Sequence, residues 1–400
     1  MIKLGMYDAG CKPANPGAYF NQIHEAGMAS KRQFRGERDN EWLGFTSAPE
    51  NRVASVQSFL KERGFFPFGK IDGLCGYRTA SSMRLFQEYV RSVEKDDSIG
   101  VADGVFGRKS LSHMKRWQDL SLHADWNQNS SVDPQPEYNK WMGLLSAVKS
   151  HYLAHPTALL RRINSYTGKT DTLGVKDWDF DPQRIHMVGI RRDEARPGRR
   201  ENDDVFILLI NGIVFKFYGT TDPGKSTRAD GAPFLLHGQH RYRFGWHKQS
   251  DMKHVYRALK PKSRGVLIVR DSNRDDALTQ TDLEGELENN NSINVHWGGR
   301  GFSNWSAGCQ VICGARYVNH HNEMVDCSAF AASRYQYLGT KVNNIYQTKG
   351  AYSVLVDLVT AFSGGDHALD YMLVYEDDLK IDAGFGADMA ARINAVMNKK

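Results

Sequence analysis

The chain has 400 residues, of which 40% are hydrophobic and 24% are charged, and its formal net charge at pH 7 is +6. These proportions are those of a soluble globular protein and exclude a disordered or fibrous chain, and the length predicts two or three domains. No run approaches the ~18 apolar residues that a membrane-spanning helix needs, and residues 1–8 lack the apolar core of a signal peptide. We therefore expect a protein made in the cytoplasm without a signal peptide and without a membrane span.

The mild positive charge includes a basic run between Arg196 and Arg200. This run lacks the interleaved aromatic residues of a protein that binds single-stranded nucleic acid, so we expect no nucleic-acid partner. A solvated loop explains the run, and a basic surface also suits an anionic cell-wall polymer. The cysteines are odd in number, which leaves at least one thiol free. They are Cys11, Cys75, Cys309, Cys313 and Cys327.

Residues 1–48 are interrupted by glycine and proline and then become polar, so they stay unassigned as an adaptor, a delivery segment or a cap. In residues 49–120, apolar side chains recur at helical spacing. Two Asp-Gly turns in this region each precede a helix, and Asp-Gly pairs favour tight turns. The turn residues are Asp72, Gly73, Asp103 and Gly104.

This repeated order of helix, Asp-Gly turn and helix resembles the small helical peptidoglycan-binding domain of many cell-wall hydrolases. The resemblance covers residues 49–120 and implies that peptidoglycan is a partner, with the two Asp-Gly turns in the binding module. A helical bundle whose Asp-Gly turns are purely structural would produce the same pattern.

Residues 121–180 are predicted to be a connector, because a polar, proline-containing stretch is followed by helical periodicity from Trp141 to Ile163. His151 and His155 lie four residues apart on this helix, a spacing that can bind metal. Pro156 follows and no zinc-protease pattern surrounds the pair. We therefore interpret the two histidines as a surface pair and expect no metal there.

Residues 181–365 contain recurring strand-like apolar runs, and Asn211-Gly212 between two of them is a strong hairpin signal. This spacing indicates a mostly antiparallel sheet rather than βαβ units. Residues 366–400 are predicted to be a packing helix with a basic tail. The expected fold class is therefore α+β and multidomain, with a small helical module followed by a mostly antiparallel, β-rich domain.

A possible active site lies in the stretch from Ser292 to Ile312. A strand-like run ends at His296, a glycine-rich loop follows, and Cys309 stands before a second apolar segment. A Cys–His pair is what nucleophilic acyl transfer requires, because the imidazole takes the thiol proton and the thiolate attacks a carbonyl. Gly308 allows close backbone approach, so amides around Cys309 can donate to an oxyanion. A buried cysteine near a surface histidine is the alternative interpretation.

The stretch resembles the active-site signature of the L,D-transpeptidase (YkuD-like) family, in which a His precedes a Ser/Thr-His-Gly-Cys motif across a short loop. Here His296 stands thirteen positions before Cys309, and Ala307 occupies the position of the second family His. The variant Trp-Ser-Ala-Gly-Cys-Gln-Val resembles a divergent branch found in phage-like and bacterial proteins. Three upstream segments fit this branch as well, namely 188–191, 220–224 and 269–273.

The resemblance implies a β-rich catalytic domain over residues 181–365 with Cys309 as the nucleophile and His296 as base and then acid. The backbone around Trp297 or Gly298 would orient His296, and amides near Gly308 and Cys309 would hold the oxyanion. Cys309 would attack the carbonyl at the third residue of a peptidoglycan stem peptide. Resolution by an amine is transpeptidation or exchange, and resolution by water is L,D-carboxypeptidase action. No metal or organic cofactor is needed.

Five further side chains are predicted to bind substrate. Arg270 ends a strand, and arginine grips carboxylates bidentately; a structural ion pair explains it equally well. Tyr242 and His247 come from a segment rich in aromatic residues and histidines that is suited to lining a pocket. Ser306 and Gln310 flank the proposed nucleophile.

A peptidoglycan substrate lies outside the cytoplasmic membrane, whereas no signal peptide is recognisable in the chain. We therefore expect action in the periplasm or cell wall of a target cell. Delivery would be by a secretion machine, as an antibacterial effector with a cognate immunity protein, or by a phage particle.

Two other classes stay open. One is a metal-dependent peptidoglycan peptidase that uses a Cys/His cluster, although the cysteines lack regular zinc spacing. The other is a non-catalytic, wall-binding phage structural protein in which Cys309 is inert. The residues that the metal cluster would draw on are Cys309, Cys313, His320, His321 and Cys327.

Overall fold

The computed structural model describes residues 1–12, 46–47, 52–127, 133–192, 202–224, 229–247, 256–301, 303–334 and 338–397. Most of the N-terminal segment, part of the polar linker and the basic run near Arg196 therefore lie outside the described residues. The chain forms two compact units, each built from three segments. Unit 1 comprises Met1–Asn127, Phe244–Ala258 and Val325–His367, and unit 2 comprises Gln128–Arg243, Leu259–Met324 and Ala368–Lys400.

The protein is mixed α/β, and its largest element is a sheet that closes on itself like a barrel. Among the described strands, the order is β11-β8-β7-β16-β3-β4-β5-β12-β13, and β11 also pairs with β12. Antiparallel neighbours prevail, as expected, but β16–β3 and β11–β12 are parallel. The bounds are β3 (His186–Arg191), β4 (Asp204–Ile210), β5 (Ile213–Thr220), β7 (Gly238–His247), β8 (Tyr256–Pro261), β11 (Val295–Trp297), β12 (Gln310–Val318), β13 (Met324–Asp326) and β16 (Ala368–Tyr375).

The hairpin of β4 and β5 forms at the predicted Asn211-Gly212 pair. Both residues have positive φ, +52° and +78°, as a two-residue hairpin turn of the favoured hand requires. The register joins Ile210 to Ile213. Every residue of β4 is buried, so both faces of this strand are covered. The alternation of polar and apolar residues that marks a half-exposed strand is accordingly absent.

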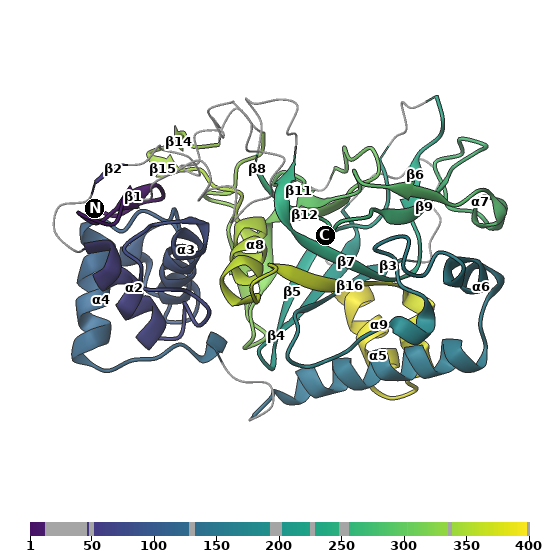
Figure 1. Ribbon diagram of the computed structural model, residues 1–400, viewed down its shortest axis with the longest axis horizontal. Coiled ribbons are helices and arrows are strands. Elements are labelled where there is room, and N and C mark those ends of the chain that lie inside the picture. The colour runs from purple at the N-terminus through teal and green to yellow at the C-terminus, as the bar shows by residue number, and fades with distance from the viewer. Residues whose placement is uncertain are drawn as a thin grey trace. The chain divides into compact units, whose positions relative to one another are not determined.

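Helices cover one face of these strands in unit 2. Apolar side chains of α5 (Pro136–Ala154), including Trp141, pack with Val188, Val205 and Ile207 of the sheet. Figure 1 shows α5 and α9 (Phe385–Met397) running along this side of the sheet. From residue 133 on, the predicted connector is thus part of unit 2, whereas residues 121–127 belong to unit 1. The remaining elements of the unit are α6 (Ala158–Asn164), α7 (Gln280–Glu284) and a small sheet of β6 (Pro233–Leu235), β9 (Val266–Arg270) and β10 (Glu288–Asn290).

Unit 1 is centred on a helical module with an aromatic core. Phe65, Phe86 and Trp117 have ring centroids 5.3–5.7 Å apart. The N-terminus of the first helix is capped by Asp8, which accepts from the amides of residues 53 and 54 at 2.8 Å. The elements are α2 (Arg52–Glu62), α3 (Tyr77–Ser92), α4 (Arg108–Asp119), α8 (Ala351–Phe362), and the short pairs β1 (Met6–Tyr7) with β2 (Thr46–Ser47) and β14 (Lys341–Val342) with β15 (Ile345–Tyr346).

The two Asp-Gly turns are built in the same way. Gln57 on α2 donates to Asp72 Oδ1 at 2.9 Å and accepts from the Gly73 amide at 2.9 Å. Gln87 on α3 donates to Asp103 Oδ1 at 3.2 Å and accepts from the next amide, that of the following glycine, at 2.9 Å. Each Asp also accepts from the amide two residues later. One carboxylate oxygen of each Asp and the amide of each Gly are therefore bonded within the module.

Helix α3 is buried on almost every side. Its Arg84 forms a bidentate pair with Asp357 of α8 at 2.9 Å, and Arg257 bonds to the same carboxylate. All three side chains are at most 7% exposed. Residues far apart in the sequence thus complete the unit around the helical module. Because α3 packs against α8, the module is not a separate lobe.

No helix among the described residues combines the length and the apolar character needed to cross a membrane.

Replacing Asp357 should destabilise unit 1, because Arg84 and Arg257 would stay buried without their counter-charge. We expect Asp357→Ala to lower the free energy of unfolding by about 3–5 kcal/mol, measured by urea denaturation. The matched control is Asp119→Ala, which removes the same charge from an exposed position of α4 and should change stability by less than about 0.5 kcal/mol. Equal stability of the two variants would contradict the role of the buried network.

Candidate active site

Cys309 and His296 are brought together by two parallel strands. Cys309 directly precedes β12, and His296 is the middle residue of β11. The register aligns Val295 with Gln310 and His296 with Val311. As a result, the Cys309 sulfur and a ring nitrogen of His296 lie within 4.8 Å of each other. Catalytic pairs are often loose before substrate binds.

The His296 ring is oriented by its own strand. Its Nδ1 lies 2.8 Å from the Trp297 carbonyl oxygen. A carbonyl only accepts, so Nδ1 carries the proton of the neutral ring and Nε2 is the basic nitrogen. His296 is 8% exposed, so its surroundings hold it firmly. The backbone of Trp297, one of the two residues expected to orient His296, thus contacts its ring.

The Cys309 thiol contacts the segment that leads into β11. Its S–H donates to the Ser292 carbonyl at 3.2 Å, and the Asn294 amide donates to the sulfur at 3.4 Å. An amide that donates to sulfur favours the thiolate, whereas the carbonyl contact favours the thiol. Proton transfer to His296 therefore requires the S–H to turn away from Ser292, while the amide contact can persist.

The loop before Cys309 depends on Gly308. Its φ is +142°, and a Cβ there would lie 2.4 Å from Pro233 Cγ and 2.9 Å from the Pro233 carbonyl oxygen. The Gly308 amide donates to Ser306 Oγ at 3.2 Å, and Ser306 Oγ donates to the Cys309 carbonyl at 2.8 Å. The amide expected to hold an oxyanion is thus bonded within the loop.

Gly298 allows β11 and β12 to approach each other. A Cβ on Gly298 would lie 1.9 Å from Val311 Cγ1. The Gly298 amide donates to the Ile312 carbonyl at 2.9 Å. A side chain here would separate the strands that carry Cys309 and His296.

Three of the predicted substrate-binding residues support the site from within the fold. Gln310 is fully buried, accepts from the Tyr371 hydroxyl at 2.8 Å and donates to the Thr221 carbonyl at 2.9 Å. Tyr242 is fully buried as well, and its hydroxyl donates to the Ile293 carbonyl at 3.0 Å. Ser306 is buried in the loop described above. These contacts give them supporting positions rather than contact with a substrate.

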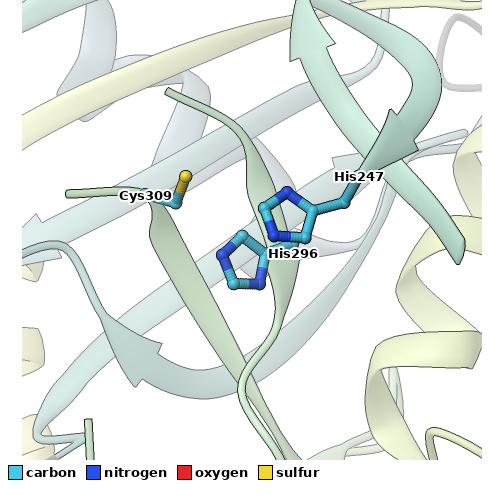
Figure 2. A group of neighbouring side chains, drawn as sticks. All are labelled: His247, His296 and Cys309. Carbon is cyan, nitrogen blue, oxygen red and sulfur yellow. The ribbon is translucent and has the colours of Figure 1, made fainter. Parts of the chain in front are cut away.

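The other two predicted substrate-binding residues are Arg270 and His247. Arg270 belongs to β9, and its guanidinium pairs bidentately with Glu288 at 2.7 Å and with Asp230 at 3.0 Å. The hydrogen bonds to Glu288 raise the pKa of Arg270, so its fork is already occupied by carboxylates. His247 is the last residue of β7 and belongs to unit 1, where its ring lies 5.3 Å from that of Tyr256. Figure 2 shows His247 with the Cys309 and His296 side chains of unit 2.

A buried polar network continues from Gln310 and was not predicted. Thr221 donates through its amide and hydroxyl to Asp204 at 2.6 and 2.8 Å, and Arg191 donates to the Thr221 carbonyl at 3.1 Å. Arg191 also pairs with Asp222 at 2.8 Å. Burial, together with the nearby Asp222 carboxylate, raises the pKa of Asp204 to about 8. An acidic residue that begins an otherwise apolar strand was the available sequence signal.

The remaining cysteines of the possible metal cluster are poorly suited to ligation. Burial raises the pKa of Cys313 and raises that of Cys327 strongly, and a thiol must lose its proton to bind metal. Cys313 donates to the Arg300 carbonyl at 3.1 Å. Cys327 belongs to unit 1, whereas Cys309, Cys313, His320 and His321 belong to unit 2.

No protein-family model, no curated protein and no solved structure matches this chain.

Gly308→Ala should reduce the reactivity of the Cys309 thiol, because the new methyl group would collide with Pro233. We expect alkylation of Cys309 by iodoacetamide, followed by peptide mass spectrometry, to slow by about tenfold, corresponding to ~1.4 kcal/mol. Gly301→Ala is the control, because a Cβ there meets no atom within 4 Å. Identical rates in the two variants would show that Gly308 does not shape the site.

Proposed function

We propose that the protein is a cysteine acyltransferase that acts on peptidoglycan stem peptides as an L,D-transpeptidase, an L,D-carboxypeptidase or both. The observation that carries this proposal is the Cys309–His296 pair, with Nδ1 of His296 bonded to the Trp297 carbonyl. With the proton of the neutral ring on Nδ1, Nε2 is the nitrogen that can accept the thiol proton, as cysteine nucleophiles require. The substrate class follows from the resemblance of residues 292–312 to the L,D-transpeptidase signature.

In the first half-reaction, Nε2 of His296 takes the proton from Cys309, and the thiolate attacks the carbonyl carbon of the third stem residue. A C–S bond forms and the carbonyl oxygen becomes an oxyanion. The C–N bond to the terminal D-residue then breaks as His296 returns the proton to the leaving amine. The products are a free D-amino acid and a thioester on Cys309.

In the second half-reaction, His296 removes a proton from the acceptor, which then attacks the thioester. The C–S bond breaks, and the thiolate recovers its proton from His296. An amine acceptor gives a new amide, which is transpeptidation or D-amino acid exchange. Water gives a tripeptide carboxylate, which is L,D-carboxypeptidase action.

The oxyanion is assigned to backbone amides of residues 308–309. The Gly308 amide can donate to the oxyanion only if it gives up its 3.2 Å hydrogen bond to Ser306 Oγ. A charged oxyanion is a stronger acceptor than a neutral hydroxyl, so the exchange becomes favourable as charge develops. Such a donor acts mainly in the transition state, which is how an oxyanion site accelerates a reaction.

The helical module is proposed to bind the cell wall. Support comes from the two Gln–Asp-Gly clamps, in which Gln57 bonds to the turn at Asp72 and Gln87 bonds to the turn at Asp103. The two halves of the peptidoglycan-binding-like pattern of residues 49–120 thus share one architecture. Since the clamp atoms bond to one another, recognition would use other surfaces of the module. Deleting the module would strip α8 of its partner helix, so the binding role is better tested by substitutions at exposed positions.

The proposed site of action is the periplasm or cell wall of a target cell. A secretion machine or a phage particle would deliver the protein, and an injected effector would have a cognate immunity protein. This part of the proposal rests on the substrate class, because peptidoglycan is found outside the cytoplasmic membrane.

Cys309→Ala should abolish turnover of a disaccharide-tetrapeptide, and His296→Ala should lower kcat by roughly 10²–10⁴-fold, the usual contribution of a general base. Product analysis by mass spectrometry measures both. The control is Cys313→Ala, on the same strand, which should retain activity. Unchanged activity in Cys309→Ala would refute the nucleophile, and loss of activity on chelation by EDTA would favour a metal-dependent peptidase.

Toxicity should depend on the compartment. Expressed in a bacterium with an added signal peptide, the protein should cause swelling or lysis during growth, because donor stems for cross-linking are depleted. The same chain without the added peptide should be tolerated, as should exported Cys309→Ala. Equal toxicity in both compartments would rule out a wall target, and a toxic exported Cys309→Ala variant would attribute the damage to binding.

A further inference from the structure

Trp305 differs from every other tryptophan in the described part of the chain. Its side chain is 90% exposed, whereas the other six described tryptophans are at most 3% exposed. Large aromatic side chains contribute strongly to binding when a partner covers them, and they are frequent among the dominant residues of interfaces. Trp305 stands four residues before the proposed nucleophile.

The exposure of Trp305 is imposed by bonds on both sides of it. Asn304 donates from Nδ2 to the Asp222 carbonyl at 2.8 Å and accepts the Ser306 amide at 2.8 Å. The Ser306 carbonyl in turn accepts the Gly224 amide at 2.7 Å. Asn304 and Ser306 are 4% and 7% exposed. The backbone on either side of Trp305 is thus anchored inward, and its indole is presented outward on a fixed support.

A further hydrogen bond connects the residue after Trp305 to the proposed nucleophile. Ser306 donates to the Cys309 carbonyl at 2.8 Å. The four residues from Trp305 to Cys309 can span at most about 14 Å even when fully extended. A substrate several residues long that reacts at Cys309 can therefore also reach Trp305.

We propose that Trp305 is a specificity-determining residue whose indole packs against a sugar ring of the substrate while the attached stem peptide reacts at Cys309. This inference rests on the proposed function, and it specifies that the enzyme recognises the glycan as well as the peptide. The C–H face of a pyranose is flat and apolar and matches an indole. The two amino acids between the sugar-bearing end and the reacting residue extend about 7 Å, which fits within the separation above.

The test compares two substrates that differ only in the glycan, a disaccharide-tetrapeptide and the free tetrapeptide. Trp305→Ala should raise KM for the disaccharide-tetrapeptide about tenfold with little change in kcat, and should leave the free tetrapeptide unaffected. Trp305→Phe should restore most of the affinity, because it keeps an aromatic face. Leu153→Ala is the control, because it removes another exposed apolar side chain of unit 2, which is 52% exposed on α5. This variant should change the KM of neither substrate.

Three results would overturn the inference. Unchanged KM values in Trp305→Ala would exclude a binding role, equal losses for both substrates would assign the contact to the peptide, and a change in kcat alone would indicate a loop defect. If the wild type converts neither substrate, the proposed reaction is refuted. The sugar contact is then tested separately, by measuring the fluorescence of the Cys309→Ala protein as the disaccharide-tetrapeptide is added. A fluorescence change with the disaccharide-tetrapeptide, absent after a further Trp305→Phe change, supports the sugar contact; no change refutes it.

Discussion

The parallel pairing of β11 with β12 is the constraint on which the candidate site depends. It closes the barrel-like sheet and aligns His296 with the residue two positions beyond Cys309. The pairing requires glycine at two positions next to Val311. A Cβ on Gly298 would collide with the Val311 side chain, and a Cβ on Gly219 of β5 would lie 1.8 Å from the Val311 carbonyl oxygen. Gly219 on β5 and Gly298, which directly follows β11, thus allow the neighbouring backbone to lie close to Val311.

Polar groups beneath the strands complete this support. Gln310 is bonded to Tyr371 and Thr221, and Thr221 is bonded to Asp204 and Arg191. Satisfied buried polar networks favour one arrangement over others, because a shifted strand would leave several groups unpaired. The residue after the proposed nucleophile is therefore held by the interior of the fold, while the loop before it is held by Asn304 and Ser306 and presents Trp305 to solvent.

Local signals in the sequence predicted local features well. The Asn211-Gly212 hairpin and the Asp-Gly turns form where expected, and His296 and Cys309 do come together. Features that depend on distant residues were not predictable. Arg84 and Asp357 pair across 273 positions, and the covering of Gln310 and Tyr242 comes from strands elsewhere in the chain. Polar side chains near a motif look alike in sequence whether they face a substrate or the core, and only the packing distinguishes them.

The proposed chemistry rests on a covalent bond to one sulfur atom, and detecting that bond tests it most directly. The protein is mixed with a disaccharide-tetrapeptide, quenched in acid within the first turnovers and digested for mass spectrometry. The account predicts that the peptide containing Cys309 gains the mass of the disaccharide-tripeptide acyl group, in a bond that hydroxylamine cleaves. No adduct while product forms, or an adduct on a different residue, would contradict the assignment of Cys309 as the nucleophile.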